Sequence, residues 1–159
     1  MITQIVILCG GRGSRLGKIT EATAKPMLKF AGEPFLTHLI KKYSRYPIDE
    51  ILLLSGYQGD EIYAQYSDKV FNGVNIKVIV EPNPLGTLGA VLGSFKFLAS
   101  EFLLTNGDSY VEYDFWKFAK WWQLVNCDYS CAIGVGSVLD TSRYGQLRVS
   151  GNTVINLAE

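Results

Sequence analysis

The sequence predicts an α/β fold in three layers, with a mostly parallel sheet covered by helices on both faces. Short apolar runs rich in β-branched residues alternate along the chain with segments whose apolar residues recur at helical spacing. The first run, at residues 4–9, is almost wholly apolar, which is typical of a strand buried on both faces. The chain has 159 residues, of which 48% are hydrophobic and 19% charged, so it is long and apolar enough for a large core. We expect one domain over residues 1–159.

The predicted elements alternate along the chain after the strand at 4–9. Apolar residues three, four or seven positions apart, such as Leu88, Val91 and Leu92, indicate helices, and Pro47 ends the first of them. The further elements, in chain order, are a helix at 33–46, a strand at 51–54, a short helix at 60–66, a strand at 75–80, a helix at 88–98, a strand at 102–104, a helix at 115–125, a strand at 129–135, and a hairpin of strands 144–149 and 153–157.

Composition excludes several classes of function. Fifteen Lys and Arg residues balance fifteen Asp and Glu residues, so no global basic field attracts nucleic acid or an anionic membrane, and an anion must be bound locally. No apolar run approaches the ~20 residues of a membrane helix, and no signal peptide is recognisable at the N-terminus. Three dispersed cysteines and the single histidine, His38, do not form a zinc site or a nucleophilic triad. We expect a cytoplasmic protein, which the odd number of cysteines also suits.

A glycine-rich loop follows the first predicted strand. It contains Gly10, Gly11 and Gly13, then Ser14 and Arg15. Glycines let backbone N–H groups approach phosphate oxygens, and an arginine adds a forked cation that suits phosphate. The spacing matches neither a Walker A loop nor a dinucleotide-binding fingerprint. The loop is therefore a candidate phosphate site, with an ordinary tight turn as the alternative.

Three further segments lie at strand ends or beside this loop. Lys25 is kept extended by the proline that follows it and could clamp a phosphate. Glu81 follows the third predicted strand and offers two acceptor oxygens to the N–H groups of guanine, with Gly86 and Thr87 close behind. Asp108 follows the fourth strand and is placed to hold Mg²⁺ on a nucleotide. Each residue alone has a simpler interpretation: a solvated lysine, a solvated glutamate and an Asx turn.

In this order, the segments resemble the sugar-1-phosphate nucleotidyltransferase family. The resemblance rests on residues 8–16, Lys25-Pro-Met27, Glu81 with 85–90, Asn106-Gly-Asp108 and Tyr144-Gly145. Gly56-Tyr57, the Glu81 segment and Asn106-Gly-Asp108 are most similar to guanylyltransferases that act on heptose or mannose 1-phosphate. The resemblance implies a Rossmann-like sheet of the GT-A type, and a reaction in which an NTP and a sugar 1-phosphate give an NDP-sugar and pyrophosphate.

The family also implies roles for individual residues. Arg15 and Lys25 would be catalytic, and Asp108 would bind Mg²⁺ as the cofactor. The nucleotide would be bound by Leu8, Gly10, Gly11, Gly13, Ser14, Arg15, Glu81, Gly86, Thr87 and Gly107, and the sugar by Tyr144, Gly145 and Glu159. Ser14 replaces the commoner threonine, and Ala24 stands where many members have proline. Members continue past a Glu-Lys pair to a later Asp, so we expect that this chain lacks the C-terminal part of the domain.

Three alternatives remain at this point. The chain could be a non-catalytic domain that binds nucleotide or sugar phosphate, or it could use UTP or dTTP in place of GTP. A glycosyltransferase with the same type of sheet usually carries Asp-x-Asp at its metal, whereas Asp108-Ser109-Tyr110 lacks the second aspartate. Trp121 and Leu124 lie off the apolar stripe of their predicted helix and are the candidate contact of a homo-oligomer.

Overall fold

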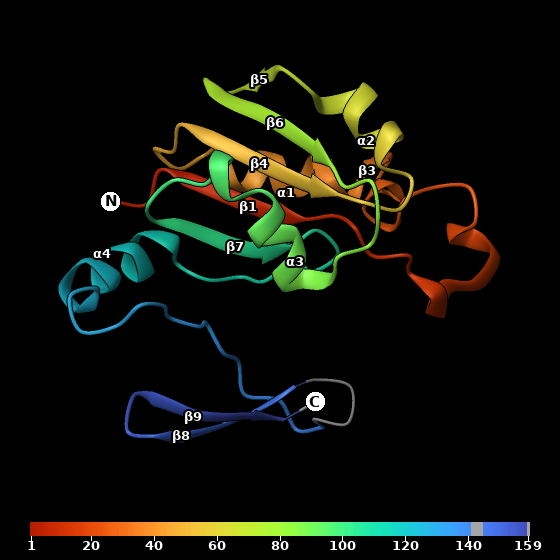
Figure 1. Cartoon of the computed structure of the whole chain (residues 1–159). Helices are drawn as coiled ribbons and strands as arrows, with labels where there is room; N and C mark the ends of the chain where they lie inside the picture. The colour runs from red at the N-terminus through yellow and green to blue at the C-terminus, as the bar shows by residue number, and fades with distance from the viewer. Residues whose placement is uncertain (141–144, 159) are drawn as a thin grey trace. The chain divides into compact units, whose positions relative to one another are not determined.

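The computed structural model describes residues 1–140 and 145–158, apart from the side chains of residues 14 and 15. Two compact units are present, Met1–Leu124 and Val125–Glu159. The first unit contains a five-stranded sheet and its helices, and the second contains a two-stranded hairpin (Figure 1).

The sheet of the first unit has the strand order β5-β6-β4-β1-β7. Its four longer strands run parallel to one another, and the short edge strand β5 pairs antiparallel with β6. The bounds are β1 (Gln4–Leu8), β4 (Glu50–Ser55), β5 (Lys69–Phe71), β6 (Val74–Val80) and β7 (Phe102–Asn106). Leu8 pairs with Leu54 on one side and with Asn106 on the other, so the carboxyl ends of β1, β4 and β7 lie at one level.

Helices cover both faces of this sheet. In Figure 1, α3 lies in front of the sheet and α1 behind it. The helices are α1 (Phe35–Tyr43), α2 (Gly59–Tyr66), α3 (Gly86–Gly93) and α4 (Phe115–Val125), and the 3₁₀ segments are η1 (Ser14–Thr20), η2 (Lys25–Met27) and η3 (Phe95–Phe97). The predicted α/β fold class, with a mostly parallel sheet between two helical layers, is confirmed.

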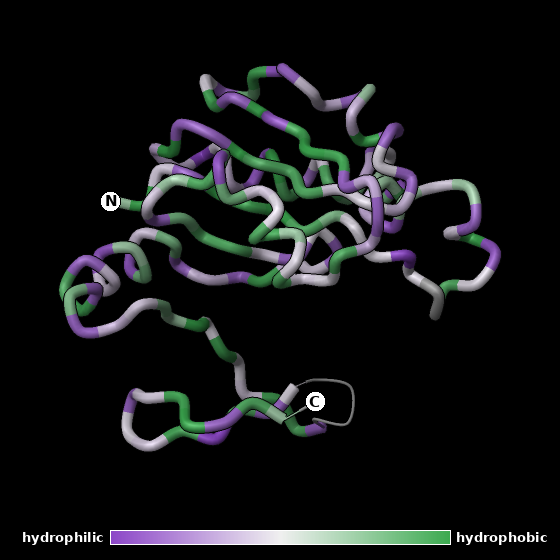
Figure 2. The backbone as a smooth tube through the Cα atoms, in the orientation of Figure 1, coloured by the Kyte–Doolittle hydropathy of each residue, from purple (hydrophilic) through white to green (hydrophobic). Residues whose placement is uncertain are grey.

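The core divides along the two faces of the central strands. On β1, Ile5 and Ile7 belong to the core shared with α1, α2 and α4, whereas Val6 belongs to the core shared with α3. All three side chains are fully buried, and burial of one such side chain contributes about 1.5–3 kcal/mol. Figure 2 shows the hydrophobic centre of the sheet in green. The continuous apolar sequence of β1 is thus explained by its position between two layers.

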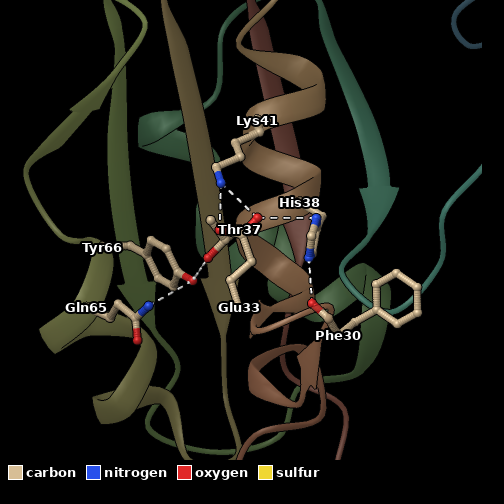
Figure 3. Close-up of polar contacts among 7 residues, drawn as sticks. All are labelled: Phe30, Glu33, Thr37, His38, Lys41, Gln65 and Tyr66. Carbon is tan, nitrogen blue, oxygen red and sulfur yellow. Dashed lines mark hydrogen bonds and ion pairs between the residues drawn. The ribbon is translucent and has the colours of Figure 1, made fainter.

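A small hairpin of β2 (Lys29–Phe30) and β3 (Glu33–Pro34) is fastened to α1 by polar contacts (Figure 3). The Nζ of Lys41 donates to the carboxylate of Glu33 at 2.6 Å, and the Nε2 of His38 lies 2.8 Å from the carbonyl of Phe30. The pKa of Glu33 is lowered, chiefly by the hydrogen bond from Lys41. The histidine therefore has a structural role in joining this hairpin to α1.

Several predicted boundaries differ from the structure. The strand expected at 129–135 is wrong, because these residues pair with no strand in the described part of the chain. The helix expected at 88–98 starts earlier and is interrupted at Ser94, whose N–H bonds to the carbonyls of Ala90 and Val91 and closes α3. The helix expected at 33–46 is shorter, because 33–34 form β3.

The second unit contains the hairpin that the sequence predicts. Its strands are β8 (Gln146–Ser150) and β9 (Thr153–Ala158), and a β-bulge lies between Arg148 and Val149. The turn has Gly151 in the left-handed region at φ 58°, which a glycine adopts without strain. None of the helices in the described ranges is both long and apolar enough to cross a bilayer.

Candidate active site

A cleft of about 440 Å³ opens at the carboxyl ends of β1, β4, β6 and β7. In open α/β sheets this edge is where ligands bind, because loops from several strands converge there. Its walls are formed by Leu8, Cys9, Gly10, Gly11, Arg12, Lys25, Pro26, Leu54, Glu81, Pro84, Gly86, Thr87, Ala90, Asn106 and Asp108. All of these residues belong to the first unit.

The glycine loop passes along this cleft in close contact with its neighbours. A Cβ on Gly10 would lie 3.4 Å from the backbone nitrogen of Gly56, so the backbones after β1 and β4 approach closely. Gly13 has φ 63°, and a Cβ there would lie 3.2 Å from the side chain of Lys25. Glycine at residue 13 therefore allows both the left-handed turn and the packing of the loop against the aliphatic part of Lys25.

Lys25 and Asp108 meet across the cleft. The Nζ of Lys25 donates a hydrogen bond to Oδ2 of Asp108 at 2.5 Å, and both side chains are about one-third exposed, at 34% and 36%. Partial burial works to raise the pKa of Asp108, but hydrogen bonds from Lys25 and Ser109 outweigh it and hold the pKa below its ordinary value. Asp108 therefore stays ionised beside the cation of Lys25. Lys25 begins the 3₁₀ segment η2, so it is not in the extended conformation expected before Pro26.

Gly107 allows Asp108 to reach the cleft. The N–H of Gly107 donates to the carbonyl of Leu8 at 2.8 Å. A Cβ on Gly107 would lie 2.8 Å from that carbonyl oxygen and 3.0 Å from the sulfur of Cys9, closer than a side chain can approach. Burial raises the pKa of the Cys9 thiol far above its ordinary value, so this cysteine is not a nucleophile.

Glu81 closes the opposite side of the cleft. Its N–H donates to the carbonyl of Ser55 at 2.7 Å, which continues the pairing of β6 with β4. Its Oε2 lies 3.5 Å from the place of a Cβ on Gly56. Partial burial raises the pKa of Glu81, although a backbone hydrogen bond from Leu85 opposes this effect. The carboxylate is thus partly desolvated and is a strong acceptor for N–H donors of a ligand.

The segment after Asp108 is anchored to α1 by Lys42. This buried lysine donates a hydrogen bond to the carbonyl of Val111. Its Nζ lies 4.3 Å from the ring centroid of Tyr110 and 5.1 Å from that of Tyr113. Burial lowers the pKa of Lys42 and outweighs the opposing effect of Glu112. Cation–π contacts and the hydrogen bond together hold the segment that follows the cleft aspartate.

The structure brings many of the residues singled out in the sequence to one cleft. Those that line it are Leu8, Gly10, Gly11, Lys25, Glu81, Gly86, Thr87 and Asp108. Gly13 and Gly107 pack beside and behind them. The side chains of Ser14 and Arg15, and the whole of Tyr144 and Glu159, lie outside the described residues. Gly145 directly precedes β8 in the second unit.

A family model described as nucleotidyl transferase matches residues 4–159 of this chain. The chain belongs to this family. The bifunctional protein GlmU of Methanococcus vannielii is 35% identical over 155 residues, which cover 97% of this chain and 34% of that protein. The D-glycero-alpha-D-manno-heptose 1-phosphate guanylyltransferase of Campylobacter jejuni is 32% identical over 152 residues, which cover 96% of this chain and 66% of that protein.

A solved structure agrees with this assignment to the nucleotidyl transferase family. The crystal structure of HddC from Yersinia pseudotuberculosis, complexed with GMP-PN, superposes with a TM-score of 0.83 at 33% identity and covers 99% of this chain and 69% of that one. The resemblance inferred from the sequence motifs is confirmed at the level of the family. The chain spans about a third of the length of the GlmU relative.

The carboxylate of Asp108 has the chemistry of a partial metal ligand. Among the described residues, no three His, Cys, Asp or Glu side chains converge as a metal cage. Mg²⁺ does not require one, because it is commonly held by one or two carboxylates, substrate phosphates and water. The ionised carboxylate of Asp108, which also accepts a hydrogen bond from Ser109 at 3.0 Å, suits that partial ligand set.

One residue of the cleft, Arg12, and its neighbour Tyr57 received no role from the sequence. Arg12 lines the cleft, and its guanidinium carbon lies 5.6 Å from the ring centroid of Tyr57. Arg12 could have been found from its position inside the glycine loop. Tyr57 directly follows Gly56 after β4, so it stands at the same edge of the sheet as the other site residues. Its contact with the loop could not be inferred, because the two segments are distant in sequence.

Proposed function

We propose that this chain transfers a guanylyl group from GTP to a sugar 1-phosphate, with an NDP-sugar and pyrophosphate as products. The observation that carries this proposal is the 2.5 Å contact of Lys25 with Asp108 beside the glycine loop. A cation for phosphate, a carboxylate for a metal and a backbone that permits close approach of phosphate thereby line one cleft. The membership of the nucleotidyl transferase family agrees with this chemistry.

The reaction needs positioning and charge neutralisation more than covalent catalysis. An anionic oxygen of the sugar phosphate attacks the α-phosphorus of the NTP, the bond from that phosphorus to the bridging oxygen breaks, and pyrophosphate leaves with the electron pair. No general base is needed, because the attacking oxygen is already deprotonated. Lys25 neutralises phosphate charge from within the cleft, and we assign to Arg15 the charge of the departing pyrophosphate.

We assign the divalent metal of the reaction, Mg²⁺, to the carboxylate of Asp108. The ion would neutralise phosphate oxygens and hold the triphosphate in one conformation. In the free protein, Lys25 donates its hydrogen bond to the same carboxylate. Lys25 would then exchange that carboxylate for a phosphate oxygen when the nucleotide binds. The substitution Asp108→Asn should raise the Mg²⁺ concentration required for half-maximal activity by about tenfold or more.

We propose guanine as the base, on the basis of Glu81. A single carboxylate can accept both the ring N–H and the exocyclic amino N–H of guanine. Gly86, which has φ 69°, and the exposed Thr87 line the same cleft as Glu81, and their small size leaves room for a base. The guanylyltransferase relatives and the HddC structure with GMP-PN favour GTP, and UTP and dTTP are the alternatives.

The remaining assignments concern the whole chain. We propose that both units belong to a single nucleotidyltransferase domain, because the family match extends over residues 4–159. Tyr144, Gly145 and Glu159 are assigned to the sugar phosphate from their sequence motifs alone. Trp121 and Leu124 are 41% and 78% exposed on α4, which favours them as the contact of a homo-oligomer. The substrates of the proposed reaction favour a cytoplasmic location.

The decisive experiment measures pyrophosphate release from a panel of NTPs with several sugar 1-phosphates. We expect the largest release with GTP and Mg²⁺, and its loss on addition of EDTA. The variants Arg15→Ala and Lys25→Ala should lower the rate by about 10²–10³-fold. If wild type and both variants are equally inactive with every pair but still bind GTP, the chain is a nucleotide-binding domain and the enzymatic proposal fails.

A further inference from the structure

We propose that Tyr57 is a positioning residue that braces both ends of the loop at residues 10–21, called here the phosphate loop. It would also hold Arg12 at the cleft for the phosphates of the nucleotide. This inference rests on the proposed binding of an NTP in the cleft. It concerns two residues that the sequence motifs did not assign to the site. The contacts of Tyr57 with Arg12 and with Glu21 carry it.

Tyr57 lies in the turn that joins β4 to α2. The turn is closed by a hydrogen bond from the N–H of Gly59 to the carbonyl of Gly56 at 2.9 Å. Gln58 occupies the left-handed region at φ 54°, which bends the chain sharply before α2. The side chain of Tyr57 therefore projects from a short, defined turn after a strand that is buried from Ile51 to Ser55, and this is a rigid base for a positioning residue.

The contacts of Tyr57 reach both ends of the loop. At the first end, its N–H donates to the carbonyl of Gly10 at 3.5 Å, and its ring lies under the guanidinium of Arg12. At the far end, beyond η1, its hydroxyl donates to the carbonyl of Glu21 at 2.7 Å, and the amide of Gln58 contacts the same carbonyl at 3.4 Å. The side chain of Tyr57 thus contacts Arg12 near the start of the phosphate loop and Glu21 at its end.

Parts of the loop between its two ends have little other support, although Gly13 packs against Lys25 and Thr20 is buried. A Cβ on Gly11 or Gly17 would meet no atom within 4 Å, and Ile19 is 63% exposed. Its hydrogen bonds are largely internal, such as that from Leu16 to Gly13 at 2.8 Å. A loop with few outside contacts loses conformational entropy when a ligand orders it, and a brace that orders it beforehand strengthens binding.

Arg12 gains a defined position from this arrangement. The guanidinium carbon lies over the tyrosine ring, 5.6 Å from its centroid, within the range of a cation–π contact. No hydrogen bond or ion pair engages the Arg12 side chain within the described ranges. Its donors are therefore available to phosphate oxygens, which a planar guanidinium binds in a bidentate manner. Arg12 is a second cation of the cleft beside Lys25.

Two substitutions of Tyr57 separate its contacts. Tyr57→Phe removes the hydrogen bond to Glu21 and keeps the ring, so we expect the dissociation constant for GTP to rise by about threefold. Tyr57→Leu removes both contacts and should raise it by about tenfold. Tyr63→Phe is the matched control, because the hydroxyl of this exposed tyrosine of α2 bonds to no described residue of the loop. Melting temperatures and hydrogen exchange of the amides at residues 10–21 are recorded for each variant.

The comparison with Arg12→Met tests whether the ring acts through the arginine. We expect Arg12→Met to weaken GTP by about tenfold and GMP by much less, because GMP lacks the terminal phosphates. The double variant Tyr57→Leu/Arg12→Met should raise the dissociation constant for GTP by less than the product of the two single effects. The brace requires faster exchange at residues 10–21 in Tyr57→Leu, with the melting temperature close to wild type.

Three results contradict the inference. They are unchanged GTP binding in Tyr57→Leu, unchanged exchange of the loop amides, and multiplicative effects of the two substitutions. A wild-type protein that binds no GTP would overturn the proposed function instead. The bracing of the loop is then still decided by hydrogen exchange in Tyr57→Leu against Tyr63→Phe, which needs no nucleotide.

Discussion

The ammonium nitrogen of Lys25 lies 2.5 Å from a carboxylate oxygen of Asp108, although the two residues are separated by 83 positions in the sequence. The ammonium of Lys25 helps to hold the pKa of Asp108 below its ordinary value, so this carboxylate stays ionised in the cleft. The aliphatic part of Lys25 also packs near Gly13, so one side chain joins the glycine loop to the end of β7. This contact fixes the positions of both side chains in the cleft of the free protein.

Acid should reveal the contribution of this ion pair to stability. Because the pKa of Asp108 lies below its ordinary value of 3.8, the pair stabilises the folded state above that pH, and this stabilisation is lost as the pH falls through the lowered pKa. We expect Lys25→Met to cost about 0.5 kcal/mol at pH 7 and less in acid. Urea unfolding at several pH values measures this. Lys120→Met, which changes an exposed lysine of α4, is the control, and an equal loss at every pH would contradict the prediction.

Replacement of Gly107 should damage both folding and the site. In Gly107→Ala the new methyl group would lie 2.8 Å from the carbonyl oxygen of Leu8, and this backbone atom cannot move without disturbing β1. We expect a loss of about 1–3 kcal/mol in the free energy of unfolding. Gly11→Ala is the control for stability, because a Cβ there meets no atom within 4 Å. Equal stability of the two variants in urea would show that the backbone at Gly107 can relax.

Glu81→Gln should weaken the preference for GTP over UTP by about tenfold, because the amide offers only one acceptor oxygen to guanine. Burial raises the pKa of Glu81, so this carboxylate is protonated at a higher pH than an ordinary glutamate. As the pH is lowered, wild-type GTP affinity should therefore begin to fall at a higher pH than an ordinary glutamate would give. In Glu81→Gln this pH dependence should disappear. Titration calorimetry with GTP and UTP across pH tests both effects. An unchanged preference in the variant would remove Glu81 from the base pocket.

Lys42→Met should destabilise the segment after Asp108. The substitution removes the hydrogen bond to Val111 and the contacts of the ammonium with Tyr110 and Tyr113, at a cost of about 1–2 kcal/mol. Hydrogen exchange at residues 109–113 should accelerate, while exchange in β4 follows only the global change in stability. Lys41→Met is the neighbouring control on the same helix. Equal exchange at 109–113 in both variants would contradict this role of Lys42.

Much of the sheet could be predicted, because its central strands have continuous apolar sequences. β1 and β4 are buried on both faces, and continuous apolar runs such as Ile5–Val6–Ile7 follow from that burial. The edge strand β5 was not predicted, because three residues are too few to show a pattern. The apolar sequence at 129–135 is typical of a strand, but a strand also needs a hydrogen-bonded neighbour, which sequence alone does not reveal.

The location of the candidate site could be predicted more readily than its contacts. Lys25, Glu81 and Asp108 follow strands or the glycine loop, and the parallel arrangement places such residues at one edge of the sheet. The proximity of Tyr57 to Arg12 and Glu21 depends on how the turn after β4 folds against the loop. That packing is tertiary and left no regular spacing in the sequence.

The enclosed thiol of Cys9 has a practical consequence for spectroscopy. Cys9 is buried beneath Gly107, whereas Cys127 and Cys131 are exposed in the second unit. Maleimide dyes should therefore attach at the two exposed cysteines and leave the floor of the cleft unmodified. With one of these two replaced by serine, a single fluorophore would report on the second unit during nucleotide titration, without protection of any residue in the cleft.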